Sequence, residues 1–252
     1  MPDELPIPQT FVPQLAGNPD VWAVLVDPPE SMARGVDALN LRVGRPVLVL
    51  IGGADGLDPV VGERVYALFR NHLMPLLAKL DAVVVDGGTD AGVMACAGQA
   101  NAARFVTHVG VAAIGTVEVP GLGGAATGTT ALEPNHSHFL LVPGDRWGDE
   151  SPWLSLAAST IAGPCPSLTL VIGGGKITRL DISHSLLAGR TTILLTGSGG
   201  VADELAAHYE SSAFSDALAA EWVSSAEIQT VRLDDAAEQL SRYILKILSC
   251  AI

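Results

Sequence analysis

Short uninterrupted runs of apolar residues recur along the chain, and a cluster of glycine and polar residues follows most of them. Such runs are typical of strands in a parallel sheet, because helices cover both faces of that sheet. We expect strands at residues 22–26, 46–51, 82–85, 108–114, 139–142, 168–172, 191–195 and 228–232, with the last at a sheet edge.

Segments with helical spacing of apolar positions separate these runs. We expect helices at residues 58–80, 91–104, 149–162, 178–188, 200–209, 212–221 and 234–250, with a kink or break at Pro75. Strands that alternate with helices form right-handed βα units around a parallel sheet. The pattern therefore predicts an α/β fold: a Rossmann-like three-layer domain with a mainly parallel sheet and helices on both faces.

Residues 1–20 are rich in proline and carry few periodic apolar positions. We expect residues 1–44 to form an N-terminal arm, with one possible edge strand at 22–26. Residues 45–252 then form the Rossmann-like domain, since no charge run or low-complexity stretch divides them. The glycine- and threonine-rich segment 117–135 is a long loop, and such loops in compact domains are usually functional or mobile.

The 252-residue chain carries 27 acidic and 14 basic residues, a formal net charge of −13. Such a surface repels a phosphate polymer, so we expect no nucleic-acid partner. A small phosphorylated ligand is still allowed, because backbone N–H groups supply local positive potential. The apolar runs are too short for a membrane span, and the acidic, proline-rich start does not resemble a signal peptide.

The three cysteines, Cys96, Cys165 and Cys250, are widely spaced and odd in number. The absence of a CxxC pair favours buried reduced thiols over a redox or zinc site. Reduced thiols suit a reducing compartment, so we expect a cytoplasmic protein.

Glycine clusters follow the strands that we expect to end at residues 51, 85, 114, 172 and 195. The carboxyl ends of parallel strands share one rim, where α/β proteins bind ligands. The turn at 87–93 opens a helix, so its N–H groups and the helix dipole favour a phosphate. A tight turn without a ligand is the alternative, because the segment matches neither the dinucleotide fingerprint nor the Walker pattern.

Two further turns carry polar side chains on the same rim. In the segment 173–181, Lys176 can neutralise a phosphate, and Thr178 can donate a hydroxyl or cap the helix. Asp181 lies one helical turn later and is either functional or simply solvated. In the segment 196–203, Ser198 is a candidate cap or phosphate donor. Three such turns on one rim favour a ligand site.

The segment 135–138 reads Asn-His-Ser-His and precedes a strand. The spacing of its two histidines permits a metal, but no third ligand stands at the usual spacing, so we expect no metal centre. A hydrogen-bonding cluster that orders the preceding loop or contacts a ribose is the other interpretation. Neither a GxSxG elbow nor a Ser–His–Asp arrangement is present.

The glycine turns and the Asn-His-Ser-His segment occur in an order that resembles the SLOG superfamily. The most similar branch is the one shared by prokaryotic proteins and the cytoplasmic N-terminal region of melastatin-type TRP channels. The resemblance covers residues 45–210 and implies binding or sensing of a nucleotide such as ADP-ribose, an NAD-related molecule or a nucleoside monophosphate, with no other cofactor. The expected ligand contacts are Gly52, Gly53, Ala54, Gly87, Gly88, Thr89, Gly92, Val93, Gly115, Thr116, Asn135, His136, His138, Gly174, Gly175, Lys176, Thr178, Gly197, Ser198 and Gly199.

A more distant resemblance is to the LOG-type phosphoribohydrolases, whose signature is PGGxGTxxE. Thr178 matches the threonine, and Asp181 stands in place of the catalytic glutamate, one methylene shorter. Ile177 replaces the second glycine, and the companion arginine is absent. Because a misplacement of about 1 Å can cost roughly 100-fold in rate, we expect a ligand sensor first. A hydrolase that cleaves an N-glycosidic bond with Asp181 is the alternative. Related Rossmann-like proteins often pair, so we also expect a homo-oligomer.

Overall fold

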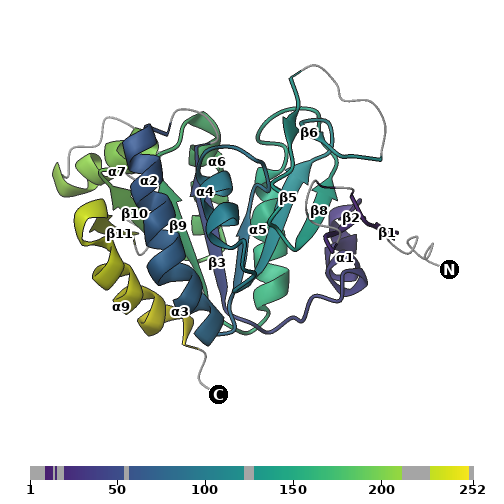
Figure 1. Ribbon diagram of the computed structural model, residues 1–252, viewed down its shortest axis with the longest axis horizontal. Coiled ribbons are helices and arrows are strands. Elements are labelled where there is room, and N and C mark those ends of the chain that lie inside the picture. The colour runs from purple at the N-terminus through teal and green to yellow at the C-terminus, as the bar shows by residue number, and fades with distance from the viewer. Residues whose placement is uncertain are drawn as a thin grey trace.

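The computed structural model of the protein describes residues 9–13, 15, 20–53, 57–121, 128–211 and 228–249. Within them nine strands form one sheet, and all neighbouring pairs are parallel except β1 with β2. The order across the sheet is β1 (Thr10–Phe11), β2 (Trp22–Leu25), β8 (His138–Val142), β5 (Thr107–Ala113), β4 (Val83–Asp86), β3 (Val47–Gly52), β9 (Ser167–Ile172), β10 (Thr191–Thr196) and β11 (Ile228–Arg232), as Figure 1 shows.

Helices cover both faces of this sheet (Figure 1). One face carries α2 (Pro59–Leu68), α3 (Met74–Lys79), α4 (Gly92–Ala100) and α9 (Ala236–Leu248). The other carries α1 (Met32–Ala38), α5 (Ser151–Ala162), α6 (Lys176–Leu187) and α7 (Gly200–Ser211). Short 3-10 turns, η1 (Pro29–Ser31) and η3 (Leu233–Asp235), precede α1 and α9. The predicted Rossmann-like, three-layer α/β architecture is therefore confirmed.

The central strand β3 explains why the strand sequences read as continuous apolar runs. Val47, Val49 and Ile51 enter the core cluster on the side of α1, α5, α6 and α7. Leu48 and Leu50 enter the core cluster on the side of α2, α3, α4 and α9. Because successive side chains of a strand point to opposite faces and both faces are covered, every position of β3 is apolar.

The helical segment around Pro75 is continuous and contains a π-helical turn, η2 (Phe69–Leu73), between α2 and α3. Proline lacks an N–H group, and its ring collides with the carbonyl four residues earlier in a regular α-helix. The wider turn directly before Pro75 accommodates both effects. The expected interruption at Pro75 is thus a local change of helix type.

The first 44 residues contribute more to the sheet than we expected. The strand β2 is not at the edge, because β1 pairs with its outer side and β8 with its inner side. The helix α1 was not predicted, since seven residues are too few to show a clear helical period. Its residues Met32 and Val36 join the core on the α5 side of the sheet.

The remaining differences concern loops and cysteines. The segment 117–135 contains a two-stranded parallel pair, β6 (Val117–Glu118) and β7 (Thr130–Ala131). Cys96 and Cys165 are each half-buried rather than buried. The helix expected at 212–221 and Cys250 lie outside the described residues. Within the described part of the chain, no helix has the length and apolar character needed to cross a bilayer.

The strand order reverses at β3. The chain runs from β3 to β4 and β5 on one side, and it later returns to β9, β10 and β11 on the other side. The gap between the carboxyl ends of β3 and β9 is therefore a topological switch point, where open α/β sheets bind their ligands.

Candidate functional site

A cavity of about 460 Å³ opens at this position, and we call it the switch-point pocket. The turns after β3 and β4 and the first turn of α6 form its walls. The residues that begin three helices line it: Ala91 before α4, Glu150 before α5 and Gly175 before α6. Helix N-termini carry partial positive charge and unpaired N–H groups, so the pocket favours an anionic group.

Nearly half of the residues that the sequence predicts as ligand-binding or catalytic line this pocket. They are Gly52, Gly53, Gly87, Thr89, Thr116, Gly175, Lys176, Thr178 and Asp181. An ideal Cβ atom at Gly87 or Gly175 would meet no other atom within 4 Å. These two glycines therefore leave open space in the pocket wall, where a ligand can approach the backbone.

Other glycines predicted as ligand contacts serve the packing of the protein itself. A Cβ atom on Gly88 would lie 2.9 Å from the Phe139 ring, and one on Gly115 would lie 2.7 Å from the carbonyl oxygen of Gly144. Val93 is fully buried in the core. The switch-point pocket is not lined by Gly88, Gly92, Val93, Gly115, Asn135, His136 or His138. Ala54 lies outside the described residues.

A second cavity of about 310 Å³ adjoins the first and contains the remaining predicted residues, Gly174, Gly197, Ser198 and Gly199. The Asp203 carboxylate already accepts hydrogen bonds from the N–H groups of Gly197 at 2.7 Å and Gly199 at 3.0 Å. The Ser198 hydroxyl accepts a hydrogen bond from the Gly173 N–H group at 2.8 Å. A ligand phosphate can reach the turn at 197–199 only by displacing Asp203.

Two carboxyl groups line the switch-point pocket, Glu150 before α5 and Asp181 in the second turn of α6. Burial raises the pKa of Asp181 to about 7; the Ser151 hydroxyl opposes this rise, and the charge of Glu150 adds to it. Burial also raises the pKa of Glu150. Near neutral pH, Asp181 therefore exchanges between its acid form and its carboxylate form.

Replacing Asp181 by Asn is expected to stabilise the protein at alkaline pH. A carboxyl group whose folded-state pKa lies near 7 instead of 3.8 costs stability that grows as pH rises between these values. Asp181→Asn should raise the free energy of unfolding on the order of 1–3 kcal/mol at about pH 8 and change it little at about pH 4. Urea unfolding at both pH values checks this, and an equal gain at both would contradict it.

Buried polar atoms without a partner gather at the switch-point pocket. Among the described residues, four buried side-chain atoms lack a hydrogen-bond partner: Thr89 Oγ1, His108 Nδ1, Ser151 Oγ and Asp181 Oδ1. Thr89 and Asp181 line the pocket, and Ser151 begins α5 next to Glu150. Because buried polar groups in native proteins are nearly always hydrogen-bonded, Thr89 Oγ1 leaves a place in the pocket wall for a polar ligand group. Ser151 and Asp181 carry less of this argument, since the Ser151 hydroxyl lies close enough to the Asp181 carboxyl group to lower its pKa.

The turn after β4 is held by a buried group of Asp86, His108, Glu133 and His136, which we call the histidine cluster. The two Asp86 oxygens each lie 2.8 Å from a histidine Nε2 atom, Oδ2 from His108 and Oδ1 from His136. His136 Nδ1 lies 2.8 Å from Glu133 Oε2. The Gly88 N–H group donates to Asp86, and the Glu133 N–H group donates to the Gly88 carbonyl. The histidine cluster therefore fixes one wall of the switch-point pocket.

Opposite charges hold the histidine cluster together. Burial alone lowers the pKa of His136, but the charges and hydrogen bonds of Asp86 and Glu133 raise it to about 9. Burial also disfavours the ionised form of Asp86, yet His136 and His108 hold its pKa well below the usual range. Burial and the charge of His136 lower the pKa of His108. At neutral pH, a charged His136 therefore lies between two carboxylates beside a neutral His108.

Replacing His136 is expected to make the free energy of unfolding fall less as pH rises in the alkaline range. The stabilising contribution of His136 is complete below its usual pKa of 6.5 and disappears as pH rises through about 9. Between about pH 7 and pH 10, the wild-type protein should lose more free energy of unfolding than His136→Gln loses. Equal losses in urea unfolding would mean that His136 is not the charged member of the cluster.

The two histidines of the Asn-His-Ser-His segment lie in different parts of the molecule, and His136 alone belongs to the histidine cluster. His138 lines a separate cavity near the amino ends of the strands.

Asp86, His108 and His136 each place one ligand atom within 4.8 Å of the others, which is close enough for a metal. However, Asp86 already bonds to the Nε2 atoms of both histidines. The ring of a metal-bound histidine is usually oriented by a hydrogen bond at its other nitrogen, and His108 Nδ1 has no such partner among the described residues. This geometry is that of a hydrogen-bond chain.

Three acidic residues of the site carry little signal in the sequence. Glu150 stands directly before a helix that starts at the ligand-binding rim, which is the one readable indication of its position. Glu133 lies three residues before His136, and both Asn135 and His136 bond to it. Asp86 joins this group from a strand far earlier in the chain, and only the fold brings the two segments together.

Comparison with known proteins gives a family and two related channels. Residues 45–241 match the family described as SLOG in TRPM, prokaryote. The chain is 25% identical over 210 residues to transient receptor potential cation channel subfamily M member 2 of Mus musculus and 24% identical over 204 residues to that of Rattus norvegicus. These alignments cover 68% and 66% of this chain but only 13% of each channel.

Two solved structures have a similar fold. The structural-genomics target TM1055 has a TM-score of 0.51 and 22% identity, over 79% of this chain and 99% of its own. The molybdenum cofactor binding protein of the phototrophic bacterium Rippkaea orientalis has a TM-score of 0.50 and 16% identity, over 79% and 98%. At these identities the likeness shows a common fold alone.

Proposed function

We propose that the switch-point pocket binds a nucleotide-derived ligand of the ADP-ribose or NAD class. The chain belongs to the family described as SLOG in TRPM, prokaryote, and this membership is the starting point of the proposal. The observation that carries this proposal is the meeting of three helix N-termini, those of α4, α5 and α6, at one cavity. A diphosphate suits this arrangement, since backbone N–H groups and helix dipoles favour negative charge. The cavity volume lies within the range of small-molecule sites.

The lining of the pocket matches the parts of such a ligand. Lys176 is exposed at the start of α6 and supplies a cation for a phosphate. Met94 and Leu154 offer apolar surface for a base. Thr89 and Asp181 offer hydrogen-bonding groups that suit ribose hydroxyls. Apolar surface with a few oriented polar groups is the usual composition of a ligand site.

A thermal-shift screen over ADP-ribose, NAD and nucleoside monophosphates tests the proposal. A ligand present at about 100 times its dissociation constant stabilises a folded protein by roughly 2.7 kcal/mol, or several degrees of melting temperature. ADP-ribose should produce such a shift, and mass spectrometry should recover it unchanged. The proposal fails if no member of the panel raises the melting temperature at millimolar concentration.

The second candidate is a hydrolase that cleaves the N-glycosidic bond of a bound nucleotide. It is favoured by one observation, the Asp181 carboxyl group with a pKa near 7 beside Glu150 in the same pocket. Such a group can act as an acid or a base at neutral pH. Chromatography of incubated nucleotides for released base tests this function. Turnover that Asp181→Ala abolishes would replace the sensor by the hydrolase.

A further inference from the structure

The Thr89 hydroxyl is a buried polar group that the described part of the fold does not use. Thr89 is 2% exposed, and its Oγ1 atom has no hydrogen-bond partner among the described residues. Five threonines of the described chain are buried, and the other four each have a partner for the hydroxyl: Thr116 the Ala113 carbonyl, Thr169 the Ser185 hydroxyl, Thr178 the Gly175 N–H group and Thr192 the Arg190 carbonyl. Thr89 is therefore the exception among them.

This exception has a cost for the folded protein. A buried hydroxyl without a partner is less stable than the methyl group of a valine, which has nearly the same shape. Thr89 lines the switch-point pocket but has almost no contact with bulk water. Folding alone would favour valine at this position, so the hydroxyl is best explained by a polar group that enters the pocket.

The backbone around Thr89 holds the side chain in one place. Thr89 and Leu132 form an isolated antiparallel bridge, and the Ala91 N–H group donates to the Thr89 carbonyl at 2.8 Å. The Asp90 N–H group donates to the Ala131 carbonyl at 2.8 Å. Because the β-branch of threonine also restricts its χ1 angle, the hydroxyl is pre-organised for a ligand.

The charge behind Thr89 favours a neutral ligand group over an anion. The preceding residue, Gly88, donates its N–H group to Asp86 and accepts the Glu133 N–H group at its carbonyl. The two carboxylates of the histidine cluster outnumber the single charge of His136. One negative charge therefore remains close to the turn that carries Thr89.

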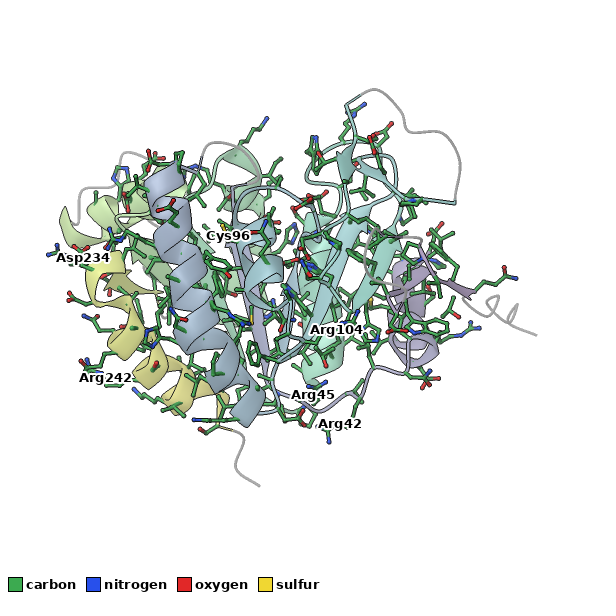
Figure 2. The ribbon with its side chains drawn as sticks, in the orientation of Figure 1. Arg42, Arg45, Cys96, Arg104, Asp234 and Arg242 are labelled. Atoms are coloured by element: carbon green, nitrogen blue, oxygen red, sulfur yellow. The ribbon has the colours of Figure 1, made fainter. Side chains whose placement is uncertain are left out.

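Positive charge lies elsewhere. Arg42 and Arg45 precede β3 and Arg104 precedes β5, so these arginines stand at the amino ends of the strands, and Figure 2 shows them together in the lower part of the view. Thr89 instead follows the carboxyl end of β4. Lys176 lines the switch-point pocket from α6, on the other face of the sheet from α4. A phosphate is thus better placed beside Lys176, and a neutral hydroxyl beside Thr89.

Given the proposed function, we propose that Thr89 is a specificity-determining residue, whose hydroxyl bonds to a ribose hydroxyl of the nucleotide and makes the pocket reject analogues that lack that group. Both hydroxyls can donate and accept, so the bond can form in either direction. A buried polar group that only one ligand satisfies gives strong discrimination, because the analogue leaves it unpaired.

Isothermal titration with ADP-ribose and with its analogues that each lack a single ribose hydroxyl tests this proposal. Thr89→Val keeps the shape of the side chain and removes the hydroxyl. Thr169→Val is the matched control, because Thr169 is also buried, but its hydroxyl bonds to Ser185 and it does not line the switch-point pocket. The melting temperature of each variant without ligand is measured as well.

One analogue should bind the wild-type protein roughly 10- to 100-fold more weakly than ADP-ribose does. Thr89→Val should bind ADP-ribose and that analogue with nearly equal affinity, whereas Thr169→Val should keep the wild-type ratio. Thr89→Val should also melt a few degrees higher than the wild-type protein, and Thr169→Val should melt lower. A residue with a purely structural role would not combine higher stability with lost discrimination.

Three results would overturn the role of Thr89 while the proposed function stands. They are equal wild-type affinities for ADP-ribose and every analogue, a wild-type ratio that persists in Thr89→Val, and a lower melting temperature of Thr89→Val, which would mean that the protein itself uses the hydroxyl. If ADP-ribose does not bind the wild-type protein at all, the proposed function fails, and the role of Thr89 fails with it.

Discussion

Replacing Asp86 by Ala is expected to lower the free energy of unfolding by about 3–5 kcal/mol, because it leaves a buried charge without its partner. Asp86 is fully buried and bonds to both His108 and His136. Without it, His136 loses the Asp86 carboxylate and keeps that of Glu133, and His108 loses the side-chain hydrogen-bond partner that it has among the described residues. For a protein of this size the melting temperature should fall by roughly 10 °C.

Asp90→Ala is the matched control for this variant. Asp90 belongs to the same turn after β4, carries the same side chain and is exposed. Its removal should change the free energy of unfolding by less than about 0.5 kcal/mol, as is usual for surface positions. Thermal and urea unfolding of both variants compare the two positions directly. Equal losses in the two variants would contradict a charged, buried histidine cluster.

Replacing Gly87 by Val should weaken ADP-ribose binding roughly 10- to 100-fold and leave the fold intact. The residue has open space within 4 Å of an added Cβ atom, and its φ is outside the left-handed region. An added Cβ atom therefore meets no protein atom, and because Gly87 lines the switch-point pocket, we expect the valine side chain to extend into it. Overpacking a site that holds a ligand costs about 1–3 kcal/mol, which corresponds to this loss of affinity.

Gly62→Val serves as the control for Gly87→Val. Gly62 lies in α2, does not line the switch-point pocket, and has its first neighbouring atom 3.6 Å from an added Cβ atom. Isothermal titration with ADP-ribose should give the wild-type affinity for Gly62→Val. If Gly87→Val binds as tightly as this control, the ligand does not contact the turn after β4.

The alternation of strands and helices was predictable because each strand is buried on both faces. In β3, for example, the neighbouring residues Leu48 and Val49 enter different core clusters, so the apolar run is unbroken. The glycine turns at Gly87 and Gly175 could also be placed at one rim, because carboxyl ends of parallel strands meet there. These features depend on local pattern and simple topology.

The features of the candidate site that the sequence does not predict depend on contacts between distant segments of the chain. The left-handed glycine Gly88 is required by the close approach of Phe139, and no local pattern distinguishes this from a ligand contact. The turn at 197–199 has the composition of an anion site, but Asp203 fills it from the following helix. Glu133 bonds to His136, and His136 bonds to Asp86, so this series of contacts depends on the tertiary structure.

A crystal structure of the protein soaked with ADP-ribose tests the central claim most directly. We predict ligand density in the switch-point pocket, with the diphosphate near the starts of α4, α5 and α6 and a ribose hydroxyl within hydrogen-bond distance of Thr89 or Asp181. Density in another cavity, or an unchanged switch-point pocket at a saturating ligand concentration, would contradict the account.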